Sequence, residues 1–236
     1  MVDSYLKGNA YNFLTLDFAA LVNGSYFSAQ RSILELVPRI SGSIFDLIDA
    51  GLDVNSFGLV GHSLGAVAIG LIGRDIHQRS NGSILLPRIS LLDPSNPEAH
   101  DDFILPEIKK TDARFIDVIH SSAGQVGTSK HSGHADFWPN GGTPIQPGCP
   151  EESISKFCSH HKSFAYWAQS VAKVNSKQLL SYRAKNYETF LEYKKAIIRT
   201  RGVPMGINCP KSAYGDYYLE LDSTYGENGD PSVVPK

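Results

Sequence analysis

Short apolar runs alternate with longer amphipathic stretches along most of this 236-residue chain. The short runs predict strands at residues 11–17, 57–62, 88–93 and 114–120. The longer stretches carry apolar residues at helical spacing and predict helices at about 28–50, 64–79 and 162–174. Because strands that alternate with helices pair in parallel, the pattern predicts an α/β fold with a mainly parallel sheet and helices on both faces.

Two stretches lack this alternation. The region between 120 and 162 is rich in glycine and proline and predicts loops. In residues 177–223 polar and aromatic residues alternate, which predicts late strands that pack on the same domain. We therefore expect one domain over residues 1–225 and a loose tail over 226–236.

The segment Gly61-His62-Ser63-Leu64-Gly65 lies between a predicted strand and a predicted helix. A serine on so sharp a turn is raised above the edge of the sheet, where it can act as a nucleophile. We expect both flanking glycines, Gly61 and Gly65, to be needed because the turn crowds its neighbours. A plain turn is the alternative interpretation of a G-x-S-x-G match.

A serine nucleophile needs a base and a carboxylate that orients the base. Asp93 ends an apolar run and is followed by Pro94, so it is a candidate carboxylate at the carboxyl edge of the sheet; a turn cap is the alternative. The chain order expected for this turn is serine, acid, histidine, which favours the late pair His160 and His161. The other candidates are less suitable: we expect His62 to point away from the site, His77 and His100 break the order or lie in polar loops, His120 ends a strand, and His131 and His134 lie in a glycine-rich loop.

Six ordered motifs resemble the animal pancreatic-lipase family, in particular its short insect lipases and the related phospholipases that cleave the sn-1 ester. The motifs are Gly61–Ala66, Leu92–Pro94, Asp112–His120, His134–Gly142, Gln146–Cys149 and Cys158–His160. The resemblance runs from about residue 5 to about residue 229. It implies an α/β-hydrolase fold, His160 as the triad base, Asp93 as its carboxylate, and the backbone N–H of Leu64 as an oxyanion donor.

The resemblance also implies the reaction. We expect a serine carboxylic-ester hydrolase that acts on phospholipid, galactolipid or glyceride through Ser63, Asp93, His160 and an acyl-enzyme, without a cofactor. The partner is then a lipid ester at a membrane or lipid-droplet surface, and the protein is extracellular. The short loop between Cys149 and Cys158 favours lipids with polar headgroups over triglycerides.

The start of the chain departs from the family pattern. Residues 11–17 match the family strand that follows a His-Gly loop, whose N–H is the second oxyanion donor. We therefore expect an N-terminally truncated lipase that lacks this donor, with a natural short form as the alternative. The missing family strand belongs between residues 11–17 and 57–62, so either these strands close the gap or the sheet is exposed there. The alternative function is a catalytically impaired, lipid-binding relative. Met1-Val2-Asp3 has no basic start or apolar run, so no signal peptide is expected here.

Three cysteines leave one without a partner. In the family, the pair at Cys149 and Cys158 is bridged; two reduced thiols are the alternative. We expect Cys209 to be a buried free thiol. Metal ligands are not expected, because Lys109 and Lys110 stand where acidic calcium ligands are wanted. His131, His134 and Asp136 also lack a regular zinc spacing.

Charge and composition exclude some classes of protein. The net charge is −2, which argues against a nucleic-acid partner, and 42% hydrophobic residues suit a globular domain. No apolar run approaches the roughly 20 residues that cross a bilayer, so no transmembrane segment is expected.

Overall fold

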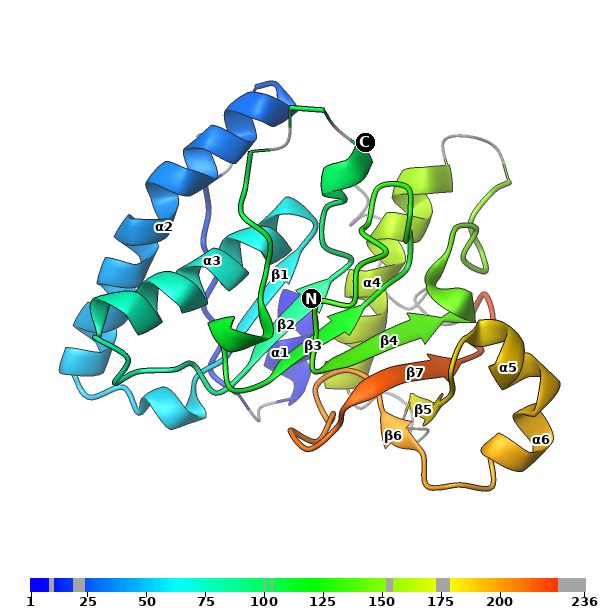
Figure 1. Ribbon diagram of the computed structural model, residues 1–236. Coiled ribbons are helices and arrows are strands. Elements are labelled where there is room, and N and C mark those ends of the chain that lie inside the picture. Colours follow the sequence, from blue (N-terminus) through cyan, green and yellow to red (C-terminus); the bar gives the residue numbers. More distant parts are fainter. Residues whose placement is uncertain are drawn as a thin grey trace.

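The computed structural model describes residues 1–8, 11–18, 24–99, 101–102, 104–151, 155–172 and 179–224. Its helices are α1 (Val2–Gly8), α2 (Tyr26–Asp49), α3 (Leu64–Arg79), α4 (Ser155–Ala172), α5 (Tyr187–Glu192) and α6 (Lys194–Ile197). Its strands are β1 (Leu59–His62), β2 (Ile89–Leu92), β3 (Ile116–Ile119), β4 (Ala135–Pro139), β5 (Leu180–Arg183), β6 (Val203–Pro204) and β7 (Gly215–Leu219). Figure 1 shows their arrangement.

The strands form one seven-stranded sheet in the order β1-β2-β3-β4-β7-β5-β6. The first five strands in this order run parallel, and β5 runs antiparallel to both of its neighbours. In the register of the first three strands, His62 lies opposite Leu92, and Leu92 lies opposite Ile119. The residues that follow them, Ser63 and Asp93 among them, therefore emerge at one edge of the sheet.

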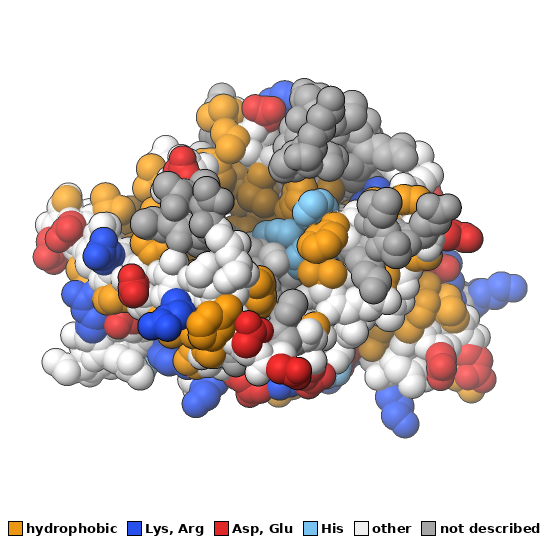
Figure 2. Space-filling view, turned by 90° about the horizontal axis from the view of Figure 1, so that it is seen from above, with side chains coloured by type: hydrophobic (Ala, Val, Ile, Leu, Met, Phe, Trp, Pro, Cys, Tyr) orange, Lys and Arg blue, Asp and Glu red, His pale blue; other side chains and the backbone are white. Residues whose placement is uncertain are grey.

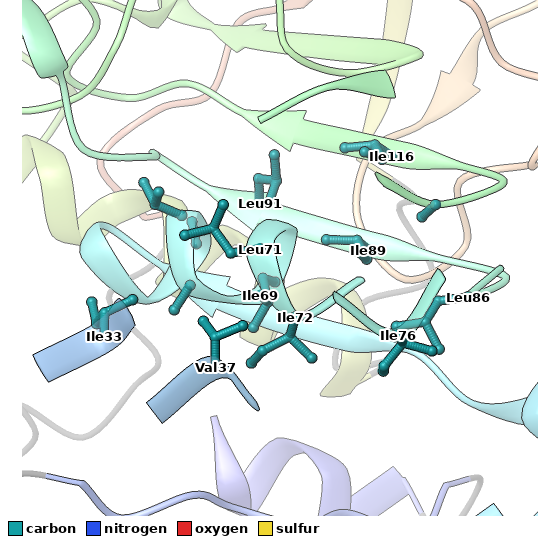
Figure 3. Packing of buried hydrophobic residues seen from close by; sticks show 14 of the residues in the cluster. Ile33, Val37, Ile69, Leu71, Ile72, Ile76, Leu86, Ile89, Leu91 and Ile116 are labelled. Carbon is teal, nitrogen blue, oxygen red and sulfur yellow. The ribbon is translucent and has the colours of Figure 1, made fainter. Parts of the chain in front are cut away.

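Helices cover both faces of the sheet, as the sequence predicts (Figure 1). Alternate residues of each strand point to opposite faces, so Ile89 and Leu91 pack under α2 and α3, whereas Leu92 packs on the α1 and α4 side. Figure 3 shows the first of these layers, in which Ile33 and Val37 of α2 face the isoleucines and leucines of α3 and the strands. The architecture is an α/β-hydrolase fold.

Several predicted elements agree with the structure in place and type. The predicted helix at 64–79 has the bounds of α3, and the strands at 57–62, 88–93 and 114–120 each contain an observed strand. Helix α2 begins two residues before its prediction because Ser25 caps it, and the Ser25 hydroxyl accepts a hydrogen bond from the Ser28 N–H at 3.2 Å. Among the described residues, no helix combines the length and apolar character needed to span a bilayer.

The predicted strand at residues 11–17 is wrong. This segment pairs with no strand of the sheet, and it exposes Leu14 by 75% and Leu16 by 58%. A strand needs a hydrogen-bonded neighbour, and the position beside β1 is not taken by this segment. Among the described strands, β1 pairs with β2 alone and so lies at an edge of the sheet.

Other differences concern the second half of the chain and its start. Strand β4 lies within the region predicted as loops, and helices α5 and α6 interrupt the stretch predicted as strands. Helix α4 starts at Ser155 and not near 162, so His160 lies inside it. Helix α1 was not predicted; it packs on α4, where Trp167 donates its indole N–H to the Tyr5 hydroxyl at 2.9 Å. The predicted tail over 226–236 lies outside the described residues.

Candidate active site

Ser63 occupies the turn between β1 and α3 in a conformation that is rare for a residue with a side chain. Its φ is 56° and its ψ is −125°. The cost of such a conformation is of order 1–3 kcal/mol, so the surrounding contacts must enforce it. The Ser63 N–H donates to the Leu92 carbonyl at 2.9 Å, which ties the turn to β2. The N–H groups of Leu64 and Gly65, in the first turn of α3, have no acceptor within the helix.

The two glycines of this turn differ in their surroundings. A Cβ on Gly61 would lie 2.5 Å from the Gly65 carbonyl oxygen, so the close approach of strand and helix requires glycine there. A Cβ on Gly65 would meet no atom within 4 Å. The expectation that crowding demands glycine is therefore supported at Gly61 and wrong at Gly65, because a side chain at Gly65 projects into open space.

Asp93 follows β2 and is fully buried. Its Oδ1 accepts hydrogen bonds from the backbone N–H groups of Ser121 at 2.8 Å and Ser122 at 3.1 Å, which follow β3. These two hydrogen bonds hold the carboxylate in place at the edge of the sheet. A Cβ on Gly127 would collide with the same carboxylate, so a glycine there leaves the space that Asp93 fills.

His160 of α4 contacts the other oxygen of this carboxylate. The distance between His160 Nδ1 and Asp93 Oδ2 is 2.6 Å, and both side chains are buried. Because Nδ1 donates to the carboxylate, the neutral imidazole presents Nε2 as a proton acceptor. His160 Nε2 is buried and has no hydrogen-bond partner among the described residues.

The Ser63 hydroxyl has a different partner. Its Oγ lies 3.2 Å from the Oγ of Ser95, which follows the Asp93-Pro94 pair. The structure thus joins Asp93 to His160 by a hydrogen bond, but it gives none between His160 and Ser63. The sequence analysis did not identify Ser95. The one signal that could have placed it near Ser63 is its position two residues after Asp93, which ends a predicted strand.

His62 connects the Ser63 turn to α4, the helix of His160, contrary to the expectation that it points away. Its Nε2 lies 3.1 Å from the His160 carbonyl oxygen, and the two rings are 4.4 Å apart between centroids. Burial, followed by repulsion from His160, lowers the pKa of His62 to about 3. His62 is therefore neutral near pH 7, where its Nε2–H can donate to that carbonyl. Burial also lowers the pKa of His161, whose ring faces Phe164 at 5.5 Å.

His120 and His134 are held in structural contacts. His120 follows β3, is fully buried, and bonds through Nε2 to Asp136 Oδ1 at 2.9 Å. Its ring also stacks on Trp138 at 3.7 Å. The Nδ1 of His134 accepts the Ile116 N–H at 3.0 Å, so that nitrogen is occupied by the backbone.

The structure brings together a different set of possible metal ligands from the one considered in the sequence. One ligand atom each of His131, Asp136 and Asp216 lies within 4.8 Å of the others. His131 Nδ1 and Asp216 Oδ1 are already hydrogen-bonded to each other at 2.8 Å. The Trp138 indole N–H donates to the same carboxylate oxygen at 2.9 Å.

A disulfide joins Cys149 to Cys158, as the resemblance implies. Cys158 lies two residues before His160, so the bridge ties the preceding loop to the turn of α4 that carries the imidazole. Phe157, beside the bridge, is 61% exposed, and its ring lies 6.5 Å from that of His160. Cys209 is a buried free thiol, and burial raises its pKa to about 12, so the reactive thiolate is not populated near neutral pH.

A cavity lies next to Ser95. Its volume is about 150 Å³ and its lining is mixed, with Val67, Pro94 and Ile108 among its apolar residues and Ser95 and Lys130 among its polar ones. On the face shown in Figure 2, histidine side chains lie beside a hollow that hydrophobic side chains border.

Comparison with known proteins agrees with this arrangement. The family model described as Lipase matches residues 1–223. This chain belongs to the lipase family. Lipase member H of Xenopus tropicalis is 31% identical to this lipase-family chain over 195 residues, which are 80% of the chain and 40% of that protein.

Two further relatives carry different names. Phospholipase A1 member A of Bos taurus is 29% identical over 194 residues, or 80% of this lipase-family chain and 41% of the relative. Pancreatic triacylglycerol lipase of Oryctolagus cuniculus is 33% identical over 199 residues, or 75% of the chain and 39% of the relative. The chain thus spans about 40% of the length of these relatives.

Proposed function

We propose that this chain hydrolyses carboxylic esters of lipids through an acyl-enzyme on Ser63. The observation that carries the proposal is the buried pair of Asp93 and His160, whose Oδ2 and Nδ1 are 2.6 Å apart. The Nε2 of His160 has no partner among the described residues, and His160 lies in the helix that contacts the Ser63 turn. Membership of the lipase family supports an ester of a lipid as the substrate. The names of the relatives, lipase and phospholipase A1, support the same class.

Three residues take part in the first half of the proposed reaction. His160 Nε2 takes the hydroxyl proton of Ser63 while the Ser63 oxygen bonds to the ester carbonyl carbon. The N–H of Leu64 donates to the carbonyl oxygen as it becomes negative. The carbon–oxygen bond to the alcohol then breaks, and the alcohol leaves with the proton from His160.

Water completes the cycle by the same route. His160 takes a proton from water as the water oxygen attacks the acyl carbon, and the fatty acid leaves when Ser63 regains its proton. Asp93 stays ionised throughout. It fixes the Nδ1–H tautomer of His160 and stabilises the imidazolium that forms in each step.

The test is the removal of the nucleophile. Ser63→Ala should abolish turnover of p-nitrophenyl butyrate and labelling by a fluorophosphonate probe, because it removes the hydroxyl that the turn after β1 presents beside the helix of His160. Asp93→Asn should lower kcat by about 10³- to 10⁴-fold, because the amide does not fix the tautomer. Ser41→Ala is the matched control, since Ser41 is buried in α2 and its hydroxyl has no partner among the described residues. Undiminished turnover by Ser63→Ala rejects the mechanism.

The substrates we propose are lipids with polar headgroups. Only eight residues separate Cys149 from Cys158, and the disulfide fixes both ends, so this loop can cover little of a bulky glyceride. Hydrolysis of phosphatidylcholine, monogalactosyl diglyceride and triolein should be compared in mixed micelles. Cleavage of triolein alone would contradict this choice of substrate and leave the acyl-enzyme mechanism intact.

We place the protein outside the cell. Disulfides persist in oxidising compartments and are rare in the cytosol, and Cys149–Cys158 is such a bridge. Thiol alkylation of the native protein before and after reduction measures the state of the pair. Two alkylated cysteines at 149 and 158 without reductant would contradict this placement.

A lipid-binding role without turnover is the second candidate. The observation that favours it is that Ser63 is hydrogen-bonded to Ser95 and not to His160. The fluorophosphonate probe separates the two functions, because it reacts only with a serine that its base activates. Lipid binding by a folded protein that resists the probe supports the second candidate.

A further inference from the structure

The Ser63 hydroxyl is hydrogen-bonded to a second hydroxyl, that of Ser95, and not to His160. The Oγ atoms of Ser63 and Ser95 are 3.2 Å apart, within hydrogen-bond distance. Of the two side chains, that of Ser95 is the more deeply buried, with 5% of the residue exposed. A buried hydroxyl needs a partner, and the nucleophile supplies one.

The position of Ser95 is fixed by the backbone on both sides. Its N–H donates to the Ser63 carbonyl at 3.3 Å, so the two serines are joined by main-chain and side-chain contacts together. Ser95 also forms an antiparallel bridge with Gly127, the residue packed against the Asp93 carboxylate. Its hydroxyl is hydrogen-bonded to the Tyr26 side chain as well. The contact with Ser63 therefore belongs to a constrained network.

The base shows the complementary feature. His160 Nε2 is buried, and it has no hydrogen-bond partner among the described residues, although Asp93 holds the other ring nitrogen. A buried nitrogen acceptor without a donor is unfavourable, and the donor that would satisfy it is the Ser63 O–H. Either hydroxyl can donate in the contact between Ser63 and Ser95. When Ser63 is the donor, its one proton serves Ser95 and not His160.

We propose that Ser95 is a positioning residue that holds the Ser63 hydroxyl in a resting orientation away from His160. This inference rests on the proposed role of Ser63 as nucleophile. Acylation then begins when the Ser63 hydroxyl turns, so that its hydrogen bond goes to His160 Nε2 instead of to the Ser95 oxygen. In the acyl-enzyme the Ser63 oxygen is esterified and has no proton to donate to Ser95. Deacylation therefore proceeds without this step.

The two half-reactions should therefore respond differently to Ser95→Ala. We expect the second-order rate constant for fluorophosphonate labelling to rise about five-fold, because one neutral hydrogen bond that opposes acylation is lost. This factor corresponds to about 1 kcal/mol. The deacylation rate, measured after rapid acylation by p-nitrophenyl butyrate, should stay unchanged. A change in packing alone has no reason to divide the two steps in this way.

Two further variants control the experiment. Ser95→Thr keeps a hydroxyl at this position and should label at the wild-type rate. Ser41→Ala removes a buried hydroxyl of α2 that has no partner among the described residues, and it should also leave labelling unchanged. Thermal melts of all variants, by circular dichroism, establish that each is folded before its rate is compared.

The outcomes are separable from those of the proposed function. Faster labelling of Ser95→Ala, with unchanged deacylation and a wild-type rate for Ser95→Thr, supports the resting contact. An unchanged or slower labelling rate overturns it, as does an equal acceleration of both half-reactions or of Ser95→Thr. Labelling that survives in Ser63→Ala refutes the nucleophile itself, whatever Ser95→Ala does.

Discussion

The two glycines of the nucleophile turn should respond in opposite ways to the addition of one methyl group. In Gly61→Ala the new Cβ would lie 2.5 Å from the Gly65 carbonyl oxygen, about 0.9 Å short of ordinary contact. That oxygen belongs to the backbone of α3, which cannot turn aside as a flexible side chain can. Strand and helix must therefore separate.

The expected cost follows from the size of this overlap. Overpacking of this kind typically costs about 1–3 kcal/mol of the free energy of unfolding. For a chain of this length, 1 kcal/mol corresponds to about 2–4 °C, so the melting temperature of Gly61→Ala should fall by roughly 2–12 °C. Displacement of Ser63 by up to about 1 Å should also slow fluorophosphonate labelling, by as much as about 100-fold.

Gly65→Ala is the matched control. Its Cβ meets no atom within 4 Å, and alanine favours the helix over glycine by up to about 1 kcal/mol. Its melting temperature should therefore equal or exceed that of the wild type. Differential scanning calorimetry and probe labelling of both variants test the argument, and an equal loss of stability in the two would refute it.

Three further predictions concern a pKa, a loop and a carboxylate. His62 has a pKa of about 3 in the folded chain and about 6.5 in the unfolded chain, so the unfolded chain binds the proton first as the pH drops. The free energy of unfolding should therefore fall by up to about 1.4 kcal/mol per pH unit between about pH 6.5 and pH 3. In urea melts, His62→Gln should lose less stability than the wild type over this range. Removing the bridge by Cys149→Ser with Cys158→Ser should cost about 2–3 kcal/mol in the same melts, because a short loop is released; an unchanged midpoint would count against that estimate. Gly127→Ala should cut kcat at least ten-fold, because its Cβ displaces the Asp93 carboxylate, and a wild-type kcat would show that the carboxylate has room to move.

The sequence predicts those parts of the fold whose signals are local. The helix predicted at 64–79 matches α3 because helical spacing and the glycine turn before it lie within one continuous stretch. Asp93 became a candidate for a similar reason, since a strand precedes it and a proline follows it directly. The order of these elements also predicts the parallel sheet.

The parts that the sequence did not predict depend on distant partners. Residues 11–17 have the apolar pattern of a strand, but a strand also requires a free neighbour, which their pattern does not report. All five residues of β4 are buried, so its sequence lacks the regular alternation of apolar and polar residues that marks a half-exposed strand. The contact of Ser63 with Ser95 joins residues 32 positions apart, and neither spacing nor residue type foretells it.

The nucleophile turn follows a strand with a single hydrogen-bonded neighbour among the described strands. Half of the peptide groups of β1 are turned away from β2, and no described strand protects them from solvent exchange. Amide hydrogens on that outer side should exchange with deuterium faster than those of β2 and β3, which are enclosed by a strand on each side. Small displacements of this edge strand are thus transmitted to Ser63, and the hydrogen bond from the Ser63 N–H to the Leu92 carbonyl is one of the restraints that limit them.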